Sequence, residues 1–364
     1  MPQYDQFTGF QSGSVEKWTQ VQKKQFNVKP FGEYDVDVEV ECCGVCSSDI
    51  HSINGGWGNS TFPLTVGHEV VGRVVRAGPK VTLMNLGDRV GIGAQIWSCL
   101  ECHQCCNENE TYCPDLIATY GHAWPQHPGL ISQGGFASHV RAHEHWVFPI
   151  PAEIPSHLAA PMLCAGITSY SPLVRFGAGP GKKVGIVGVG GLGHYGILFS
   201  AALGAETWAI ARTNAKKEDT IKMGAIGYLA TSEKDWNVPH KMTFDLIIST
   251  ANSFGDGSDL GAYLSLLNVL GKWVSVGMPE EATLTIRPQD LAGNGCFVGA
   301  THLGSRKEML DMLQLAVSKN ISSWVETVPI NAENLSKTFK SLHENSGAVR
   351  YRYCMTEYDK EFKQ

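Results

Sequence analysis

The stretch from Lys183 to Gly196, which reads KVGIVGVGGLGHYG, constrains the fold of this chain more than any other. An apolar run comes first, a glycine turn follows, and helix-compatible residues continue to Leu203. This is the G-x-G-x-x-G fingerprint in the strand, turn and helix setting that dinucleotide-binding folds use. The pattern therefore predicts a doubly wound parallel sheet with a cofactor at this turn.

Each glycine of the fingerprint has its own expected task. Gly188 permits the tight turn, Gly190 lets the backbone approach a pyrophosphate, and Gly193 lets helix and strand pack closely. The helix N-terminus then faces the phosphates. The expected cofactor-binding turn comprises Gly188, Gly190, Gly191, Leu192 and Gly193.

The end of the next expected strand indicates which dinucleotide binds. This strand ends at Ala211, and Arg212 follows at the place where an acidic residue would bind the ribose 2′-hydroxyl of NAD. Arginine suits the 2′-phosphate of NADP instead, and Lys216 and Lys217 add positive charge nearby. NADP is therefore the expected cofactor, and the alternative is a solvated basic loop.

Alternating patterns elsewhere indicate the rest of the architecture. At 364 residues the chain exceeds the usual size of one domain. Residues 33–41 alternate strictly between acidic residues and tyrosine or valine, which predicts a half-buried strand in a compact, β-rich first domain. Later strands and helix-like segments alternate as a parallel sheet requires. We expect strands at 69–78, 244–250, 272–277, 296–300 and 349–354, and helical segments at 259–270 and 307–318.

Composition excludes several classes of protein. With 18% charged and 43% apolar residues, the chain has the composition of an ordinary folded protein, and its net charge of −6 leaves no basic excess for nucleic acid or an anionic membrane. The uncharged run 184–205 is long enough to span a membrane, but its seven glycines and a histidine argue against a span. The first ten residues lack a secretory pattern, so we expect a cytoplasmic protein.

The cysteines point to metal. There are eleven, an odd number, and a reducing compartment disfavours disulfides, which remain the alternative. Four of them share one polar loop with the spacing C-x2-C-x2-C-x7-C, and four thiolates make the closed tetrahedral shell of a structural zinc. These are Cys99, Cys102, Cys105 and Cys113, with Cys106 able to compete for the place of Cys105.

A second group of possible ligands lies in residues 44–69, which hold a thiol, hydroxyls, two imidazoles and two carboxylates. Such a density suits a metal that must stay open to a substrate. By contrast, the solitary Cys164 in an apolar segment reads by itself as inert packing. His143 and His145 are expected on one face of a strand, as partly exposed residues rather than a metal pair.

Together these motifs resemble the zinc-containing medium-chain alcohol dehydrogenases, closest to the NADP-dependent cinnamyl alcohol dehydrogenase group, over nearly the whole chain. The matching pieces are the four-cysteine loop, GVCSSDIH at 44–51, GHEVVGRVVRAG at 67–78, SQGGFASHV at 132–140, MLCAGIT at 162–168 and GVGGLGHYG at 188–196.

The resemblance implies a role for each residue of the first group. Cys46, His68 and Cys164 are expected to bind a catalytic zinc, with a fourth position left for water or substrate. Glu69 is expected beside the metal as a transient ligand, and Asp49 to orient His68. Both acids could instead be ordinary buried, hydrogen-bonded carboxylates.

Further roles follow from the same resemblance. A proton relay is expected through Ser48 and then His51, and Thr168 is expected near the nicotinamide. Arg350 resembles an arginine that contacts the cofactor pyrophosphate, with Arg352 as the alternative. Trp57, Gln95, Trp97 and Tyr120 occupy segments that line the substrate pocket in relatives, or they are ordinary core.

One departure concerns the cofactor. Related NADP-dependent members commonly carry serine before the arginine of the second strand, and here the residue is Ala211. One hydrogen bond to the phosphate is lost, so Thr213 or Asn214 is expected to substitute.

The resemblance also implies the whole arrangement. We expect a GroES-like catalytic zinc domain at 1–160 and 299–364, a Rossmann NADP-binding domain at 161–298, two zinc ions per chain, an active site in the cleft, and a homodimer. The expected reaction interconverts primary alcohols and aldehydes that are aromatic, branched or medium-chain, such as cinnamaldehyde, by hydride transfer to or from NADP(H), with aldehyde reduction in the cell. A polyol dehydrogenase and a non-catalytic NADPH-binding protein are the alternatives.

Overall fold

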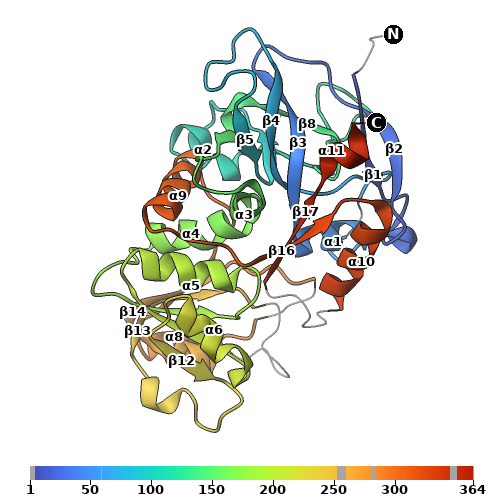
Figure 1. The fold of residues 1–364 in the computed structure, drawn as a ribbon. Coiled ribbons are helices and arrows are strands. Elements are labelled where there is room, and N and C mark those ends of the chain that lie inside the picture. The colour runs from blue at the N-terminus through green and yellow to red at the C-terminus, as the bar shows by residue number, and fades with distance from the viewer. Residues whose placement is uncertain (1–4, 59, 252–259, 281–283, 345–350, 364) are drawn as a thin grey trace. The chain divides into compact units, whose positions relative to one another are not determined.

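The computed structural model describes residues 5–58, 60–251, 260–280, 284–344 and 351–363. These residues form two compact units (Figure 1). Unit 1 comprises residues 1–164, 305–317 and 322–364, and unit 2 comprises residues 165–304 and 318–321. The units therefore divide at 164 and 304 rather than at the expected 160 and 298. The short helix η4 (Ala160–Leu163) packs on β3 and β4 of unit 1, which carries Cys164 into that unit.

Unit 1 is built on a seven-stranded sheet with the order β16-β17-β3-β4-β5-β9, and β8 also pairs with β3. All of its pairs are antiparallel except β16 with β17. Late and early segments of the chain thus lie side by side, which Figure 1 shows as red β17 beside blue β3. The strands are β3 (Asp35–Val45), β4 (Glu69–Ala77), β5 (Arg89–Ile92), β8 (His139–His143), β9 (Val147–Pro149), β16 (Val325–Pro329) and β17 (Arg352–Thr356).

Two strands of unit 1 differ from their expected bounds. β3 runs on to Val45, so that Cys46 lies directly at its end. β17 begins only at Arg352, and the preceding residues 349 and 350 lie outside the described part of the chain. The strand carrying His143 also stops there, because the His143 side chain accepts the His145 N–H at 3.2 Å and a 3-10 turn follows. The two histidines therefore do not share a strand face as expected.

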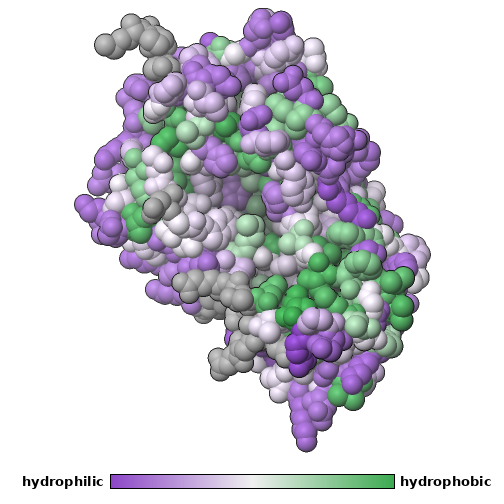
Figure 2. All heavy atoms as spheres, turned by 180° about the vertical axis from the view of Figure 1, so that it is seen from behind, coloured by the Kyte–Doolittle hydropathy of each residue, from purple (hydrophilic) through white to green (hydrophobic). Residues whose placement is uncertain are grey.

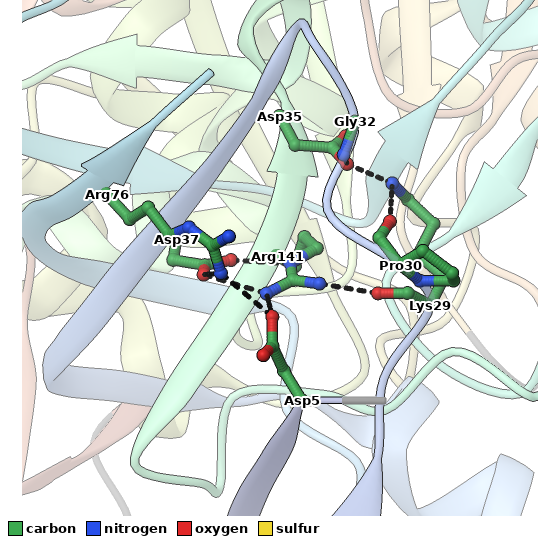
Figure 3. A network of polar contacts seen from close by, with 8 residues as sticks. All are labelled: Asp5, Lys29, Pro30, Gly32, Asp35, Asp37, Arg76 and Arg141. Carbon is green, nitrogen blue, oxygen red and sulfur yellow. Dashed lines mark hydrogen bonds and ion pairs between the residues drawn. The ribbon is translucent and has the colours of Figure 1, made fainter. Parts of the chain in front are cut away.

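A polar residue of β3 takes part in a buried network of hydrogen bonds (Figure 3). Val36, Val38 and Val40 face the core as expected, but Asp37 is also buried. Its carboxylate accepts two hydrogen bonds from the Arg141 guanidinium on β8, at 2.7 and 2.9 Å. Arg141 also donates to Asp5, at 2.6 Å, so a residue before β1 joins the network.

Two hairpins and several helices complete unit 1. The hairpin strands are β1 (Gln6–Gln11) with β2 (Gln22–Asn27), and β6 (Gln95–Trp97) with β7 (Ile117–Ala118). The helices are η1 (Val15–Lys17), α1 (Ser47–Ile53), α2 (His103–Cys106), η2 (Glu110–Tyr112), η3 (Glu144–Trp146), α3 (Ser156–Ala159), α9 (Arg306–Ser318), α10 (Ala332–His343) and α11 (Tyr358–Phe362).

Unit 2 holds a six-stranded sheet in which every pair is parallel, in the order β12-β11-β10-β13-β14-β15. The order reverses at β10, which confirms the expected doubly wound fold class. The strands are β10 (Lys183–Val187), β11 (Glu206–Ala211), β12 (Gly227–Ala230), β13 (Phe244–Ser249), β14 (Leu267–Ser275) and β15 (Phe297–Ala300).

The helices of unit 2 connect these strands. They are α4 (Ala165–Arg175), α5 (Gly193–Ala202), η5 (Asn214–Lys216), α6 (Lys217–Lys222), η6 (Val238–His240), α7 (Gly261–Leu264) and α8 (Pro288–Ala292). The helical segment expected up to residue 270 is shorter, because α7 ends at Leu264 and β14 starts at Leu267. Within the described residues, no helix combines the length and apolar character that a membrane crossing needs.

Candidate active site

Four possible metal ligands meet in unit 1. Cys46, His68, Glu69 and Cys164 are all buried, and one ligand atom of each lies within 4.8 Å of those of the others. Cys46 follows β3 and caps α1, His68 and Glu69 stand at the start of β4, and Cys164 follows η4. The fold thus brings the solitary Cys164 to residues almost a hundred positions earlier.

Asp49 holds this group together. Its carboxylate accepts the backbone N–H of Cys46 at 2.9 Å and that of Gly67 at 3.0 Å. It also accepts from His68 Nδ1 at 2.9 Å, which fixes the proton of the ring on Nδ1. His68 Nε2 is then the ring nitrogen that faces Cys164 Sγ, at 3.0 Å. This is the orientation that a metal-binding imidazole requires.

Charge is unevenly distributed over these four side chains. A hydrogen bond with Cys164 holds the pKa of Cys46 well below its usual value, and the same bond raises the pKa of Cys164. Burial raises the pKa of Glu69 to about 8. Burial alone would lower the pKa of His68, but the Asp49 carboxylate outweighs it and raises that pKa. Such a buried set of soft and acidic donors fits a divalent cation.

Glu69 has a cationic partner that the sequence analysis did not assign. One carboxylate oxygen, Oε1, forms a hydrogen-bonded ion pair with Arg352 of β17, and both side chains are buried. The other oxygen, Oε2, has no hydrogen-bond partner among the described residues, which leaves it available to a metal. Arg352 is therefore bound to a carboxylate of unit 1, whereas Arg350 lies outside the described residues.

The expected relay residues lie on α1. Ser48 is partly exposed, and its hydroxyl oxygen is 3.5 Å from Cys46 Sγ. His51 is three residues further along the same helix, which places both on one face. The His51 ring packs on Trp57 with 5.0 Å between centroids. The two residues expected to form the relay therefore lie close together on α1.

The four aromatic and polar residues expected near the substrate differ in their surroundings. Tyr120 lies against the His68 ring with 5.6 Å between centroids, and Trp57 is 42% exposed. Trp97 is partly buried. Gln95 is buried, and its side-chain amide donates to the Thr111 carbonyl at 3.1 Å. Tyr120 thus contacts a residue of the metal-binding group, and Trp57 contacts His51.

The four-cysteine loop also brings its sulfurs together. The Sγ atoms of Cys99, Cys102, Cys105 and Cys113 lie within 4.8 Å of one another. Cys106 is exposed and its thiol donates to the Glu101 carbonyl at 3.4 Å, outside this group. Backbone N–H groups of the loop lower the pKa of Cys99 to about 7. Four thiols of this kind, one already acidic, fit a zinc ion with a closed shell.

Unit 2 carries the expected features of a nucleotide turn. Gly188 has φ +87°, and a Cβ on Gly193 would lie 1.8 Å from the Gly188 carbonyl oxygen, so both positions require glycine. A Cβ on Gly190 would meet nothing within 4 Å, which leaves that side of the turn open.

The residues expected around this turn are placed as follows. Arg212 is exposed directly after β11, and the Lys216 ammonium donates to the Val189 carbonyl at 2.7 Å. Thr168 is buried on α4. The Asn214 amide donates to Glu233 at 2.8 Å.

Comparison with known proteins identifies the family. The model of the alcohol dehydrogenase GroES-like domain matches residues 32–152. The NADP-dependent alcohol dehydrogenase 6 of Saccharomyces cerevisiae is 47% identical over 361 residues, which cover 98% of either chain. The chain belongs to the zinc-containing medium-chain alcohol dehydrogenase family. The resemblance found in the sequence is thereby confirmed.

Other members of the family extend this result. A probable mannitol dehydrogenase of Fragaria ananassa is 39% identical over 89% of this chain and 88% of its own. The structure of a cinnamyl alcohol dehydrogenase of Sorghum bicolor matches with a TM-score of 0.90 and 31% identity, over 97% of this chain and 98% of the other. Both domains of this alcohol dehydrogenase thus follow the family fold.

Sequence reasoning missed Gly44 as well as the ion pair of Arg352. A Cβ on Gly44 would lie 2.0 Å from Glu69 Oε2, so this glycine gives the carboxylate its space. The one available signal was a glycine in a strand otherwise made of large residues, which often marks a close approach.

Proposed function

We propose that this alcohol dehydrogenase interconverts primary alcohols and aldehydes with NADP(H) at a zinc ion held by Cys46, His68 and Cys164. In the cell, the proposed reaction is the reduction of cinnamaldehyde-like aldehydes. The observation that carries the proposal is the buried convergence of these three side chains with Glu69. The names of the yeast and Sorghum relatives support the cofactor and the substrate class.

The bound groups would supply the chemistry that side chains lack: zinc polarises the substrate oxygen, and the nicotinamide carries the hydride. The chain's own residues prepare and complete the reaction. Asp49 keeps the proton of His68 on Nδ1, at 2.9 Å, so that Nε2 stays free for the metal. Ser48 exchanges the proton of the substrate oxygen, and His51 passes it to water.

Glu69 is proposed as a transient fourth ligand during exchange of water and substrate. Its Oε2 is buried without a hydrogen bond among the described residues, while Arg352 balances the charge through Oε1. A carboxylate with one free oxygen can approach a cation without breaking its ion pair.

We assign recognition of the cofactor's 2′-phosphate to Arg212 and Lys216, and contact with its pyrophosphate to the glycine turn and Arg350. Arg212→Ser should raise the KM for NADPH about 10-fold or more and leave the KM for NADH within about twofold, since one charge-assisted hydrogen bond is worth about 1.5–3 kcal/mol. Equal losses with both cofactors would contradict the assignment.

A steady-state screen tests the reaction itself. Cinnamaldehyde, benzaldehyde and a ketose are each offered with NADPH and with NADH. We expect rapid reduction of the aldehydes with NADPH alone. A preference for the ketose with NADH would favour the polyol dehydrogenase reading, to which the name of the Fragaria relative points.

A second experiment tests the metal site. Cys46→Ala should abolish turnover while NADPH still binds, because Cys46 belongs to unit 1 and the nucleotide turn to unit 2. Normal turnover by this variant would refute the zinc mechanism. If Cys46→Ala loses turnover but still binds NADPH, the wild-type chain is a catalyst and not merely an NADPH-binding protein.

The remaining proposals concern assembly and location. We propose a second, structural zinc at the four-cysteine loop and a cytoplasmic homodimer that forms through the free edge of β15. Phe297 on this strand is 59% exposed, and Val269 and Leu270 are more exposed still, at 65% and 61%. Figure 2 shows apolar side chains gathered at the lower right of that view. Sedimentation of the wild type and of Phe297→Asp would test the dimer.

A further inference from the structure

The carbonyl groups of the glycine turn in unit 2 are all bound by the protein. Three accept a backbone N–H: Val187 O accepts that of Thr250 at 2.8 Å, Gly190 O that of His194 at 3.0 Å, and Leu192 O that of Gly196 at 3.0 Å. Side chains bind four carbonyls, of which that of Leu192 also accepts the backbone N–H. Lys216 Nζ donates to Val189 O at 2.7 Å, His194 Nδ1 to Gly191 O at 2.8 Å, and Ser169 Oγ to Leu192 O at 2.9 Å. The Thr250 hydroxyl lies 2.9 Å from Gly188 O and 3.0 Å from Val187 O, and it shares its one proton between them.

The amide groups of the same turn behave in the opposite way. Within the described part of the chain, no protein acceptor takes the backbone N–H of any residue from 189 to 193. Five consecutive amides are thus left for a ligand, and a row of this kind binds anions.

The two halves of this pattern are linked by the planarity of the peptide unit. In a trans peptide the carbonyl of one residue and the N–H of the next point in opposite directions. A side chain that holds Gly188 O therefore also aims the N–H of Val189, and one that holds Leu192 O aims the N–H of Gly193. The four side chains act on four of the five free amides in this way.

These side chains come from separate parts of unit 2. Ser169 lies on α4 and His194 on α5, and both are fully buried. Lys216 closes η5, and Thr250 follows β13. Because the anchors are fixed by different elements, the turn cannot rotate one peptide without breaking a hydrogen bond to the body of the unit. A rotated peptide would present a carbonyl oxygen to a phosphate and repel it.

We propose that Ser169, His194 and Thr250 are positioning residues for the cofactor pyrophosphate, which they do not touch. They hold the carbonyls of the turn so that its amides face the phosphates before the cofactor arrives. This inference rests on the proposed binding of NADP(H). It assigns to Lys216 a structural hydrogen bond in addition to its expected charge interaction.

Thr250→Val is the sharpest test, because valine keeps the shape of threonine and removes the hydroxyl. We expect the Kd of NADPH to rise about 3- to 10-fold, the effect of one ordinary hydrogen bond. Ser169→Ala should give a smaller loss, because the Gly196 N–H still binds Leu192 O, and Thr250→Ser should restore most of the affinity. Thr243→Val is the matched control, since its hydroxyl donates to Lys241 O at 3.3 Å, away from the turn.

Cofactor fragments separate positioning from a general loss of structure. Adenosine 2′,5′-bisphosphate carries a phosphate for the turn, whereas adenosine 2′-monophosphate carries none. Thr250→Val should weaken the first about 3- to 10-fold and leave the second within about twofold. Thermal unfolding of each variant checks that unit 2 remains folded.

The outcomes are distinct. If wild-type protein binds NADPH and both turn variants bind it equally well, the positioning role is refuted while the proposed function stands. An equal weakening of both fragments would also refute it. If wild-type protein binds neither NADPH nor adenosine 2′,5′-bisphosphate, the proposed function fails, and this inference fails with it.

Discussion

Glu69 on β4 reaches Arg352 on β17 across Gly44, which lies on the strand between them. Gly44 is the direct partner of Glu69 in the β3–β4 ladder and of Cys354 in the β17–β3 ladder. Without a side chain at this position, the carboxylate can lie over the middle strand and meet the guanidinium. One missing Cβ thus allows a charged pair to form inside the sheet.

This relationship predicts the effect of Gly44→Ala. The new Cβ would lie 2.0 Å from Glu69 Oε2, so the carboxylate must move away from Arg352. We expect a loss of about 3 kcal/mol in the free energy of unfolding, as for overpacking and for a broken buried ion pair. Chemical denaturation measures it. Gly13→Ala is the control, because nothing lies within 4 Å of its added Cβ, and equal stability of the two variants would contradict the prediction.

The four-cysteine loop yields a prediction about metal content. Cys102→Ser removes one sulfur from the group, whereas Cys106→Ser removes a neighbouring thiol that lies outside it. Elemental analysis should find about one zinc ion per chain less in the first variant and no change in the second, because a structural site needs all four ligands. The melting temperature should fall in the first variant alone. A zinc loss in Cys106→Ser would show that the ligands are assigned wrongly.

Arg141→Met tests the buried network of Figure 3. It leaves the Asp37 carboxylate buried without its two hydrogen bonds, and breaking one partner of a buried pair costs about 3–5 kcal/mol. Replacing both partners, as Arg141→Met with Asp37→Leu, should recover part of this loss. Urea unfolding of the single and double variants measures the coupling. Arg76→Met should cost less than about 1 kcal/mol, since its side chain is 50% exposed.

Glu110 should contribute to stability in a pH-dependent way. Burial alone would raise the pKa of this carboxyl, but hydrogen bonds from His145 at 3.2 Å and from the Arg306 N–H at 2.6 Å outweigh it and lower the pKa. A lowered folded-state pKa means that the unfolded chain binds the proton more readily. The contribution is complete above the usual pKa of 4.5 and is lost as the pH falls through the lowered folded value.

The variant Glu110→Gln makes this measurable. It should melt at a lower temperature than the wild type at pH 6, and its melting temperature should fall less between pH 6 and pH 4. Glu333→Gln serves as the control, because Glu333 also has a lowered pKa but is fully exposed, and it should match the wild type throughout. Parallel pH profiles for wild type and Glu110→Gln would contradict this account.

Much of the fold could be predicted because its signals are local. The glycine fingerprint and the alternating β3 segment each follow from the backbone geometry of one stretch of chain. Boundaries were harder where tertiary pairing decided them. β14 begins at Leu267 because it pairs with Phe244 of β13, although residues 259–270 read as a helix.

Site residues divide in the same way. The spacing of the four cysteines is a local signal, but the place of Cys164 beside His68 depends on packing between distant segments. The ion pair of Arg352 depends on the order β17-β3-β4, which no local pattern encodes. From the sequence, only the resemblance to a family could predict that Cys164 belongs to the site. No motif predicted that Arg352 pairs with the carboxylate of Glu69.

The position of β17 in the chain has a consequence for how the protein matures. A ribosome releases residues in order, so residues 1–164 and then nearly all of unit 2 emerge before β17 is made. Until that strand adds to β3, Glu69 sits in an unfinished sheet without a counter-charge. The metal group therefore gains its electrostatic balance among the last steps of synthesis, and a nascent chain stalled after unit 2 would hold every expected zinc ligand but lack the arginine that neutralises Glu69.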